Sequence, residues 1–243
     1  PAVMVKRGAG FVRRRFFGKK ARYLPKKQVL EAQRRKDTSD FPVISILLPV
    51  YNTPMKYMRE LVESVQAQTC PRWQLCIADA SDEAHREVGE YLERLSLEDG
   101  RIRYAKVENK GIAANTNAAE ELAEGEYLAL ADHDDLLAPH AIYEMGKAIL
   151  ETEAAFLYSD EALFETSMQR PKVGHFKPDY APDYLLCCNY ICHLACFSRE
   201  VYEQIGGERP ECDGSQDHDL FLRLIEVVGE HAVYHVPKVL YYW

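Results

Sequence analysis

Four short strand-like runs alternate with helical patterns, and this alternation constrains the fold of the 243-residue chain most strongly. The runs cover residues 43–48, 74–79, 101–107 and 127–131. The first is almost wholly apolar and stops at Pro49, which is typical of a strand buried on both faces in a parallel sheet. Apolar residues recur at helical spacing over 58–65 and 88–95, and residues 112–123 are rich in alanine. The alternation predicts an α/β fold with a mostly parallel, Rossmann-like sheet flanked by helices.

The second half of the chain has a less regular pattern. Residues 154–159 and 190–198 are predicted to be strands, and 217–228 a helix. Residues 233–243 are predicted to mix strand and turn. We therefore expect one domain over 42–243, with a nucleotide-binding half (42–135) and an acceptor half (136–243).

The distribution of charge divides the chain at about residue 40. Residues 1–40 carry 13 Lys and Arg against 3 Asp and Glu, whereas residues 41–243 carry 17 against 35. The acidic body argues against nucleic acid as a partner. Residues 1–41 are predicted to be a basic N-terminal arm or linker, either solvated or in contact with an anionic membrane surface through residues 1–40.

The sequence also bears on the cellular compartment. No window approaches 18 apolar residues, and no leader-like segment is visible. Seven cysteines, an odd number, favour a reducing environment. We expect a cytoplasmic protein, with peripheral contact at the inner membrane face through the arm.

Three of the cysteines recur every four residues beside a histidine. Cys188, Cys192 and Cys196 flank His193 among apolar neighbours. This setting favours small buried hydrophobic residues. A metal-binding or redox role is the alternative, although zinc sites usually place cysteine pairs at two separated points of the chain.

Polar residues follow each strand of the first half. The resulting loops are a first loop (49–52), a second loop (79–82), a third loop (109–111) and a fourth loop (132–135). Ligands of parallel α/β sheets bind beyond the carboxyl ends of the strands, so these loops are expected to form one site. The first loop has no glycine, which excludes the dinucleotide fingerprint, and no P-loop motif is present.

The fourth loop carries three carboxylates in four residues. Asp132 and Asp134 have a spacing that suits one divalent cation, and oxygen ligands favour Mg²⁺ or Mn²⁺. The alternative is a solvated acidic loop that caps the following helix. Without a glycine-rich cradle, a metal is the remaining means of holding phosphates. The pattern therefore indicates a nucleoside diphosphate bound through a divalent cation.

At this point the chain resembles a known family. Its motifs VISILLPVYN (43–52), DAS (79–81), NKG (109–111) and LADHDDLLAPHA (130–141) are similar to those of family-two inverting glycosyltransferases of GT-A fold. KPDYAPDYLL (177–186), NYICHL (189–194) and GSQDHDLFLR (214–223) resemble the bacterial subgroup that builds O-antigen and related surface polysaccharides. The resemblance covers roughly residues 42–243.

The resemblance implies a role for each matching residue. Asp217 would be the catalytic base, and Asp132 and Asp134 would hold Mn²⁺ or Mg²⁺. The nucleotide-sugar-binding residues would be Pro49, Val50, Tyr51, Asn52, Asp79, Lys110, Gly111, Asp132 and His133. Asn189 and His193 are expected on the acceptor side, with a satisfied core histidine as the alternative for His193.

The chain departs from the family pattern at three points. Ala78 stands where many members have a second acid beside the equivalent of Asp79, and Gln216 replaces a glutamate before the catalytic aspartate. Similar proteins also continue past the equivalent of Trp243 into an Arg-x-His stretch that can complete the metal site. Asp219 is the rival base, and its helical position should turn it aside.

The resemblance implies a function. We expect a metal-dependent inverting transfer of a hexose or deoxyhexose from a nucleotide diphosphate sugar to a saccharide or lipid-linked acceptor. The alternatives are a metal-dependent nucleotidyltransferase and a non-catalytic nucleotide-sugar-binding module of a larger polymerase. Transfer activity, and release of nucleoside diphosphate instead of pyrophosphate, distinguish the three.

Overall fold

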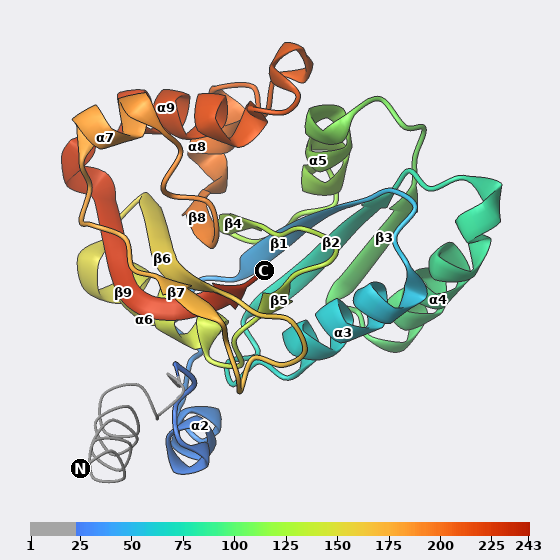
Figure 1. Cartoon of the computed structure of the whole chain (residues 1–243), viewed down its shortest axis with the longest axis horizontal. Coiled ribbons are helices and arrows are strands. Elements are labelled where there is room, and N and C mark those ends of the chain that lie inside the picture. Colours follow the sequence, from blue (N-terminus) through green and yellow to red (C-terminus); the bar gives the residue numbers. More distant parts are fainter. Residues whose placement is uncertain (1–22) are drawn as a thin grey trace, which may run out of the picture.

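The computed structural model describes residues 23–243 as a mixed α/β fold around one curled sheet (Figure 1). Over these residues the sheet has nine strands in the order β3-β2-β1-β4-β8-β6-β9-β5, and β7 pairs with β6. The predicted α/β class is confirmed. The sheet places residues 42–135 and 136–243, the predicted nucleotide-binding half and acceptor half, side by side, joined where β4 pairs with β8.

The elements have the following bounds. The strands are β1 (Ile44–Val50), β2 (Trp73–Asp79), β3 (Ile102–Lys106), β4 (Tyr127–Leu130), β5 (Leu136–Leu137), β6 (Phe156–Leu163), β7 (Val173–His175), β8 (Ala195–Ser198) and β9 (Val233–Tyr242). The α-helices are α2 (Lys27–Arg34), α3 (Met55–Gln66), α4 (Arg86–Glu98), α5 (Ile112–Glu120), α6 (Ala141–Thr152), α7 (Pro182–Cys187), α8 (Arg199–Gln204) and α9 (Gln216–Val228).

The first four strands are parallel, as their apolar runs predict. Side chains of β1 alternate between the two faces of the sheet. Ile46 and Leu48 pack with residues of α3, α4 and α6, whereas Leu47 packs with residues of α5, α8 and α9. Figure 1 shows these two groups of helices on opposite sides of the sheet. Burial on both faces explains why β1 is almost wholly apolar.

The prediction that Pro49 ends the first strand is wrong, because β1 continues to Val50. Strand β4 pairs with β1 only as far as Leu47, so Pro49 has a strand neighbour only on the β2 side. The amide of Ile44 donates toward β2, and the alternation of a strand turns the nitrogen of Pro49 to the other side. The missing N–H therefore breaks no ladder bond.

The acceptor half is less regular, and its pairings are mixed. Strand β8 is antiparallel to both β4 and β6, whereas β6 and β9 are parallel. The predicted strand over 190–198 is confined to β8, and the predicted mixture over 233–243 is the continuous strand β9. Helix α6 was not predicted, because buried side chains surround it and leave no clear apolar stripe.

The predicted basic arm falls partly outside the described residues, since residues 1–22 lie beyond them. Its remaining part contains α2, which contacts the body. Gln33 Nε2 donates to Glu144 Oε1 at 2.9 Å, and Thr69 Oγ1 donates to Gln33 Oε1 at 3.0 Å. This segment is thus attached to α6 and to the turn after α3. Over residues 23–243, no helix has the length and apolar character that a membrane crossing requires.

Candidate active site

The first and second loops are joined by hydrogen bonds at the carboxyl ends of β1 and β2. The Asn52 amide donates to Ser81 Oγ at 2.9 Å, and its side chain exchanges hydrogen bonds with Asp82 at 2.9 and 3.0 Å. Asn52 has a φ of 51°, a left-handed conformation that asparagine tolerates. Of the other first-loop residues, Val50 is buried, Pro49 half-buried and Tyr51 exposed.

Asp79 ends β2 and is buried, with its side chain 1% exposed. Its carboxylate accepts hydrogen bonds from the Ser81 amide at 2.9 Å, Tyr104 Oη at 3.0 Å and Lys106 Nζ at 3.1 Å. Burial would raise the pKa of Asp79, but these hydrogen bonds outweigh it and lower the pKa. Asp79 thus orders the second loop, and its predicted contact with a nucleotide base stays a prediction.

The third loop contacts the segment before α9. Gly111 has a φ of 98°, and a Cβ at this position would collide with the Asp213 carboxylate. Asp213 Oδ1 accepts a hydrogen bond from the Ala113 amide at 3.0 Å, in the first turn of α5. Glycine is therefore needed where the two halves meet. The Lys110 side chain is exposed and lies 3.4 Å from Glu108 Oε2.

The fourth loop leads from β4 to the acceptor half. The Asp132 amide donates to Tyr241 Oη at 2.9 Å, and Asp132 Oδ2 lies 3.2 Å from His193 Nε2. Burial would raise the pKa of Asp132, but the hydrogen bond and charge of His193 lower it. The Asp134 side chain is 58% exposed, and the nearest basic group, His133 Nδ1, lies at 3.9 Å.

A hollow of about 440 Å³ lies between this loop and the acceptor half. It is lined by Asp132, Asp134, Asp135, Glu161, Cys192, His193 and Trp243. Asp135 is buried, and burial together with the charges of its two acidic neighbours raises its pKa to about 7. The hollow therefore carries a high density of carboxyl groups with a single histidine.

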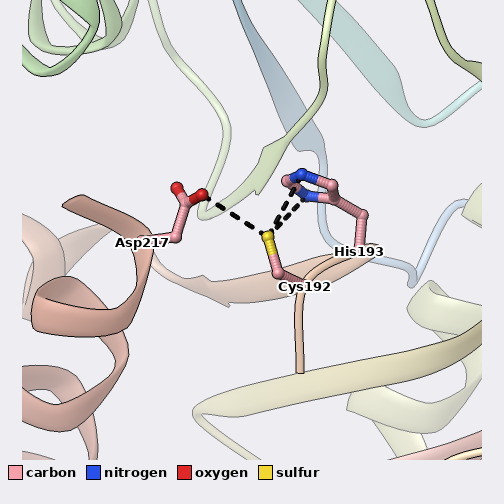
Figure 2. Close-up of side chains that lie close together, drawn as sticks. All are labelled: Cys192, His193 and Asp217. Atoms are coloured by element: carbon pink, nitrogen blue, oxygen red, sulfur yellow. Dashed lines mark hydrogen bonds between the residues drawn. The ribbon is translucent and has the colours of Figure 1, made fainter. Parts of the chain in front are cut away.

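Asp217 approaches the same hollow from the first turn of α9. Cys192 Sγ lies 3.4 Å from Asp217 Oδ2 and donates its proton to it, and the same sulfur lies 3.1 Å from His193 Nε2 (Figure 2). Burial raises the pKa of Asp217, and the charge of Asp132 adds to this. Burial would lower the pKa of His193, but the Cys192 sulfur and Asp132 raise it well above its ordinary value. A raised pKa suits a carboxylate that accepts a proton.

The neighbours of Asp217 on α9 have other contacts. Asp219 Oδ2 accepts a hydrogen bond from Arg223 Nε at 2.8 Å, and its Oδ1 lies 3.4 Å from Arg209 Nη1. These ion pairs agree with the prediction that Asp219 points to another side of the helix than Asp217. Gln216 is buried, and its Oε1 accepts a hydrogen bond from the Gly214 amide at 2.8 Å.

Two residues position His193, and this role was not predicted from the sequence. Glu161 Oε2 accepts a hydrogen bond from the His193 amide at 2.7 Å and from Lys177 Nζ at 3.1 Å. Lys177 Nζ also donates to the carbonyls of Ile191 and His193 at 2.8 and 2.6 Å. Asp160 and Glu161 directly follow the predicted strand over 154–159, a position from which they could line the cleft or be exposed. Both are buried in β6, and Glu161 lines the hollow.

Glu208 is another buried residue near the site, and the sequence did not single it out. It is 2% exposed, and Oε2 has no hydrogen-bond partner among the described residues. Burial, followed by the charge of Asp217, raises its pKa to about 9, so this carboxyl group is protonated at neutral pH. No local pattern marks it, because its burial depends on the packing of its segment against α5, where the amide of Glu208 donates to Asn117 Oδ1 at 2.9 Å.

The cysteine run does not form one buried group. Cys196 is buried as predicted, but Cys188 is exposed and Cys192 is half-buried beside Asp217. The segment is not helical over 188–198, so spacing by four does not place the three on one face. Asn189, expected on the acceptor side, is half-buried, and its Oδ1 has no partner among residues 23–243.

The residues at the fourth loop fit a hard divalent cation. Asp132 and Asp134 line one hollow, and the Asp134 carboxylate accepts no hydrogen bond from another described residue. Carboxylate oxygens of this kind are the preferred ligands of Mg²⁺ and Mn²⁺. The structure therefore brings Asp132, Asp134 and His193 to one hollow, and Asp217 contacts Cys192 at its wall. Lys110 and Asn189 are not among the described residues that line this hollow.

Comparison with known proteins bears on the family and the fold of the chain. The sequence model described as glycosyl transferase family 2 matches residues 45–206. An uncharacterized protein of Sinorhizobium fredii is 39% identical over 204 residues, which are 83% of this chain and 22% of that protein. The O-antigen biosynthesis protein RfbC of Myxococcus xanthus is 33% identical over 204 residues, 83% of this chain and 16% of RfbC. The chain thus spans about a fifth of the length of these relatives.

Solved structures share the fold. The 1–349 segment of TarS of S. aureus in complex with UDP-GlcNAc has a TM-score of 0.65 at 17% identity, over 83% of this chain and 58% of that segment. The mannosyltransferase PcManGT of Pyrobaculum calidifontis in complex with GDP-Man and Mn²⁺ has a TM-score of 0.58 at 15% identity, over 89% of this chain and 62% of that protein.

Proposed function

Since the chain belongs to glycosyl transferase family 2 and is a glycosyltransferase of GT-A fold, we propose that it transfers a sugar from a nucleotide diphosphate sugar to an acceptor hydroxyl with inversion. The acceptor is a saccharide or a lipid-linked saccharide of a surface polysaccharide. The relationship to RfbC, an O-antigen biosynthesis protein, supports this acceptor class. The UDP-GlcNAc and GDP-Man complexes of TarS and PcManGT support the donor class.

The observation that carries the proposal is the approach of Asp217 to the fourth loop. Asp217 begins a helix of the acceptor half, yet Cys192 and His193 connect it to Asp132 through contacts of 3.1 to 3.4 Å. One group that can accept a proton therefore lies beside the acids that follow β4. A single displacement at a sugar carbon needs a base that takes the acceptor proton and acids that hold a metal against the leaving group.

The donor would lie along the four loops of the nucleotide-binding half. Asn52 and Asp82 hold the first two loops together, and Gly111 fixes the third against Asp213. These fixed loops frame a nucleotide at the carboxyl ends of the strands, where ligands of such sheets bind. Asp132 and Asp134 would hold Mn²⁺ or Mg²⁺, which supplies positive charge against the diphosphate when bound.

Asp217 would act on the acceptor. As the acceptor oxygen attacks C1 of the sugar, its proton moves to an Asp217 oxygen, and a new C1–O bond forms. The bond between C1 and the diphosphate oxygen breaks, and its electron pair leaves with the nucleoside diphosphate. Attack opposite to the leaving group inverts C1. The raised pKa of Asp217 increases its ability to take the proton.

Two alternatives are weighed against sugar transfer. A nucleotidyltransferase would release pyrophosphate, and membership of glycosyl transferase family 2 argues against it. A non-catalytic nucleotide-sugar-binding module is the second alternative, because the chain spans only about a fifth of its curated relatives. The half-exposed Asp132, exposed Asp134 and half-buried Asp217 favour a catalytic site.

The test begins with a thermal-shift screen of the chain against nucleotide sugars, with and without Mn²⁺. The stabilising donor is then incubated with saccharide acceptors, and the products are separated. We expect release of nucleoside diphosphate, an inverted linkage, and loss of both stabilisation and transfer with a chelator. Release of pyrophosphate, or donor binding without transfer to any acceptor, would contradict the proposal.

A peripheral membrane contact through the basic residues 1–40 belongs to the same proposal, since a lipid-linked acceptor lies at a membrane. Each Lys or Arg near an anionic surface contributes about 1 kcal/mol, and the effect weakens with salt. Sedimentation with vesicles should show salt-sensitive binding to anionic lipid that deletion of residues 1–40 removes. Equal sedimentation with neutral vesicles would contradict this contact.

A further inference from the structure

Cys192 is the part of the active site that sugar transfer does not use. Its sulfur lies 3.4 Å from Asp217 Oδ2, 3.4 Å from His193 Nδ1 and 3.1 Å from His193 Nε2 (Figure 2). A thiol here neither takes the acceptor proton nor binds a diphosphate. Its position between an imidazole and a carboxylate nevertheless brings together three kinds of metal ligand.

The ligand atoms have separations that suit a small cation. One atom each from Cys192, His193 and Asp217 lie within 4.8 Å of one another. Zinc bonds of about 2.3 Å to sulfur and 2.0–2.2 Å to nitrogen or oxygen place tetrahedral ligands roughly 3.3–3.6 Å apart. The contacts of the sulfur, at 3.1 to 3.4 Å, are close to these separations. A cation bound to this sulfur would therefore lie within reach of both His193 and Asp217.

His193 is also held as a metal-binding histidine usually is. With Nδ1 as the ligand, Nε2–H faces Asp132 Oδ2 at 3.2 Å, and a carboxylate on the second nitrogen is the common support of such a histidine. The backbone of His193 is fixed by Glu161 and Lys177, and its ring lies 5.0 Å from the ring of Tyr241. The backbone contacts, Asp132 and Tyr241 thus fix the position of His193 before a cation arrives.

We propose that Cys192, His193 and Asp217 form a second cation site that prefers a thiophilic divalent cation such as Zn²⁺. Sulfur and imidazole select Zn²⁺ over Mg²⁺ and Mn²⁺, which prefer oxygen ligands. The site is therefore distinct in chemistry from the carboxylate pair Asp132 and Asp134. As the cation binds, the Cys192 thiol proton and the His193 Nδ1 proton both leave to solvent, so sulfur binds as thiolate and the imidazole binds as its neutral form.

Occupancy of this site has a consequence for catalysis, which rests on the proposed function. Asp217 Oδ2 would be a ligand and no longer free to accept the acceptor proton. Zn²⁺ should therefore inhibit transfer even when Mn²⁺ is present at the fourth loop. Three protein ligands leave a fourth position toward the hollow for water or an acceptor group.

Co²⁺ provides the direct test, because thiolate coordination gives a charge-transfer band in the near ultraviolet and tetrahedral coordination gives visible bands. Purified chain, reduced and without donor, is titrated with Co²⁺ and then with Zn²⁺ or Mn²⁺. We expect a thiolate band that Zn²⁺ removes and Mn²⁺ does not. Cys192→Ser should abolish the band and weaken Zn²⁺ binding at least about tenfold, the loss that even a supporting residue causes.

Cys188→Ser is the matched control, since Cys188 is exposed and four residues away, and it should keep the band. Asp217→Asn gives a second variant that should keep a thiolate band with weaker Zn²⁺ binding. Absence of the band in the unaltered chain, or its persistence in Cys192→Ser, would overturn the proposal. These readouts need no donor or acceptor, so they can fail while sugar transfer stands.

Discussion

The nucleotide-binding half and the acceptor half build their parts of the active site in different ways. In the first, each loop follows the strand that positions it, as Asp79 is the last residue of β2 and Asp132 lies just beyond β4. In the second, His193 lies in an irregular segment and depends on Glu161, Lys177 and Tyr241 for its position. Local pattern thus determines where the loops of residues 42–135 begin, whereas tertiary contacts determine the geometry around Asp217, the proposed base.

The largest effect should come from the base. Asp217→Asn keeps the shape but cannot take a proton, and loss of general-base catalysis lowers the rate about 10²–10⁴-fold. Asp219→Asn is the matched control, because Asp219 pairs with Arg223 and Arg209, and it should lower the rate far less. Initial rates at saturating donor are the measurement. Near-normal transfer by Asp217→Asn with an inactive Asp219→Asn would assign the base to Asp219.

The next largest effect, on unfolding free energy, should come from removing the lysine partner of a buried carboxylate, with one such pair in each half. Lys177, 5% exposed, neutralises Glu161, so Lys177→Met leaves a buried charge and should cost about 3–5 kcal/mol in unfolding free energy. Lys106→Met in the nucleotide-binding half should cost less, because Lys106 is half-exposed and Asp79 keeps two other donors.

Urea unfolding of both variants checks this difference. Glu161→Gln added to Lys177→Met should restore part of the loss, since it removes the unpaired charge. Equal losses at Lys177 and Lys106 would mean that the acceptor half depends no more on buried charge pairs than its neighbour does.

Donor binding that depends on the metal should change the stability of the chain by a smaller amount. A donor at 100 times its dissociation constant adds about 2.7 kcal/mol to stability. Asp134→Ala should abolish the Mn²⁺-dependent part of this gain, whereas Asp183→Ala, an exposed acid on α7, should keep it. Thermal unfolding with nucleoside diphosphate, with and without chelator, measures the gain. A chelator-insensitive shift would contradict the metal assignment.

The last effect is a pH dependence of the unfolding free energy, and it should come from Glu208. Because its pKa rises from 4.5 to about 9 on folding, its contribution is full below pH 4.5 and is lost as pH rises toward 9. Glu208→Gln removes this loss, so its stability relative to the unaltered chain should increase by up to about 1.4 kcal/mol per pH unit between pH 5 and 8. Glu211→Gln, at an exposed neighbour, should follow the unaltered chain. Parallel curves for Glu208→Gln would contradict a buried neutral carboxyl group.

The difference between the halves also explains what could be predicted from sequence. The parallel strands and their loops were predictable because strand burial on both faces leaves an apolar run such as residues 43–48. The aspartates at 132, 134 and 217 were identified through family motifs, and the structure brings the first and last together through His193.

The acceptor half was harder to predict for physical reasons. Helix α6 is buried around most of its circumference, and β9 continues through Pro237, so neither shows the usual pattern. Lys177 and Glu208 are charged residue types whose burial depends on distant partners. Cys192 was grouped with Cys196 by spacing, although only the fold separates a thiol beside Asp217 from one in the core.

The central claim is that one half holds the donor and the other supplies the base. Equilibrium binding of the nucleotide sugar with Mn²⁺, measured side by side in Asp217→Asn and Asp134→Ala, tests it most directly. The account predicts that Asp217→Asn binds the donor within about twofold of the unaltered chain while transfer is lost. Asp134→Ala should lose most of the binding itself. Equal loss of donor affinity in both variants would contradict the division, because Asp217 would then belong to the donor site.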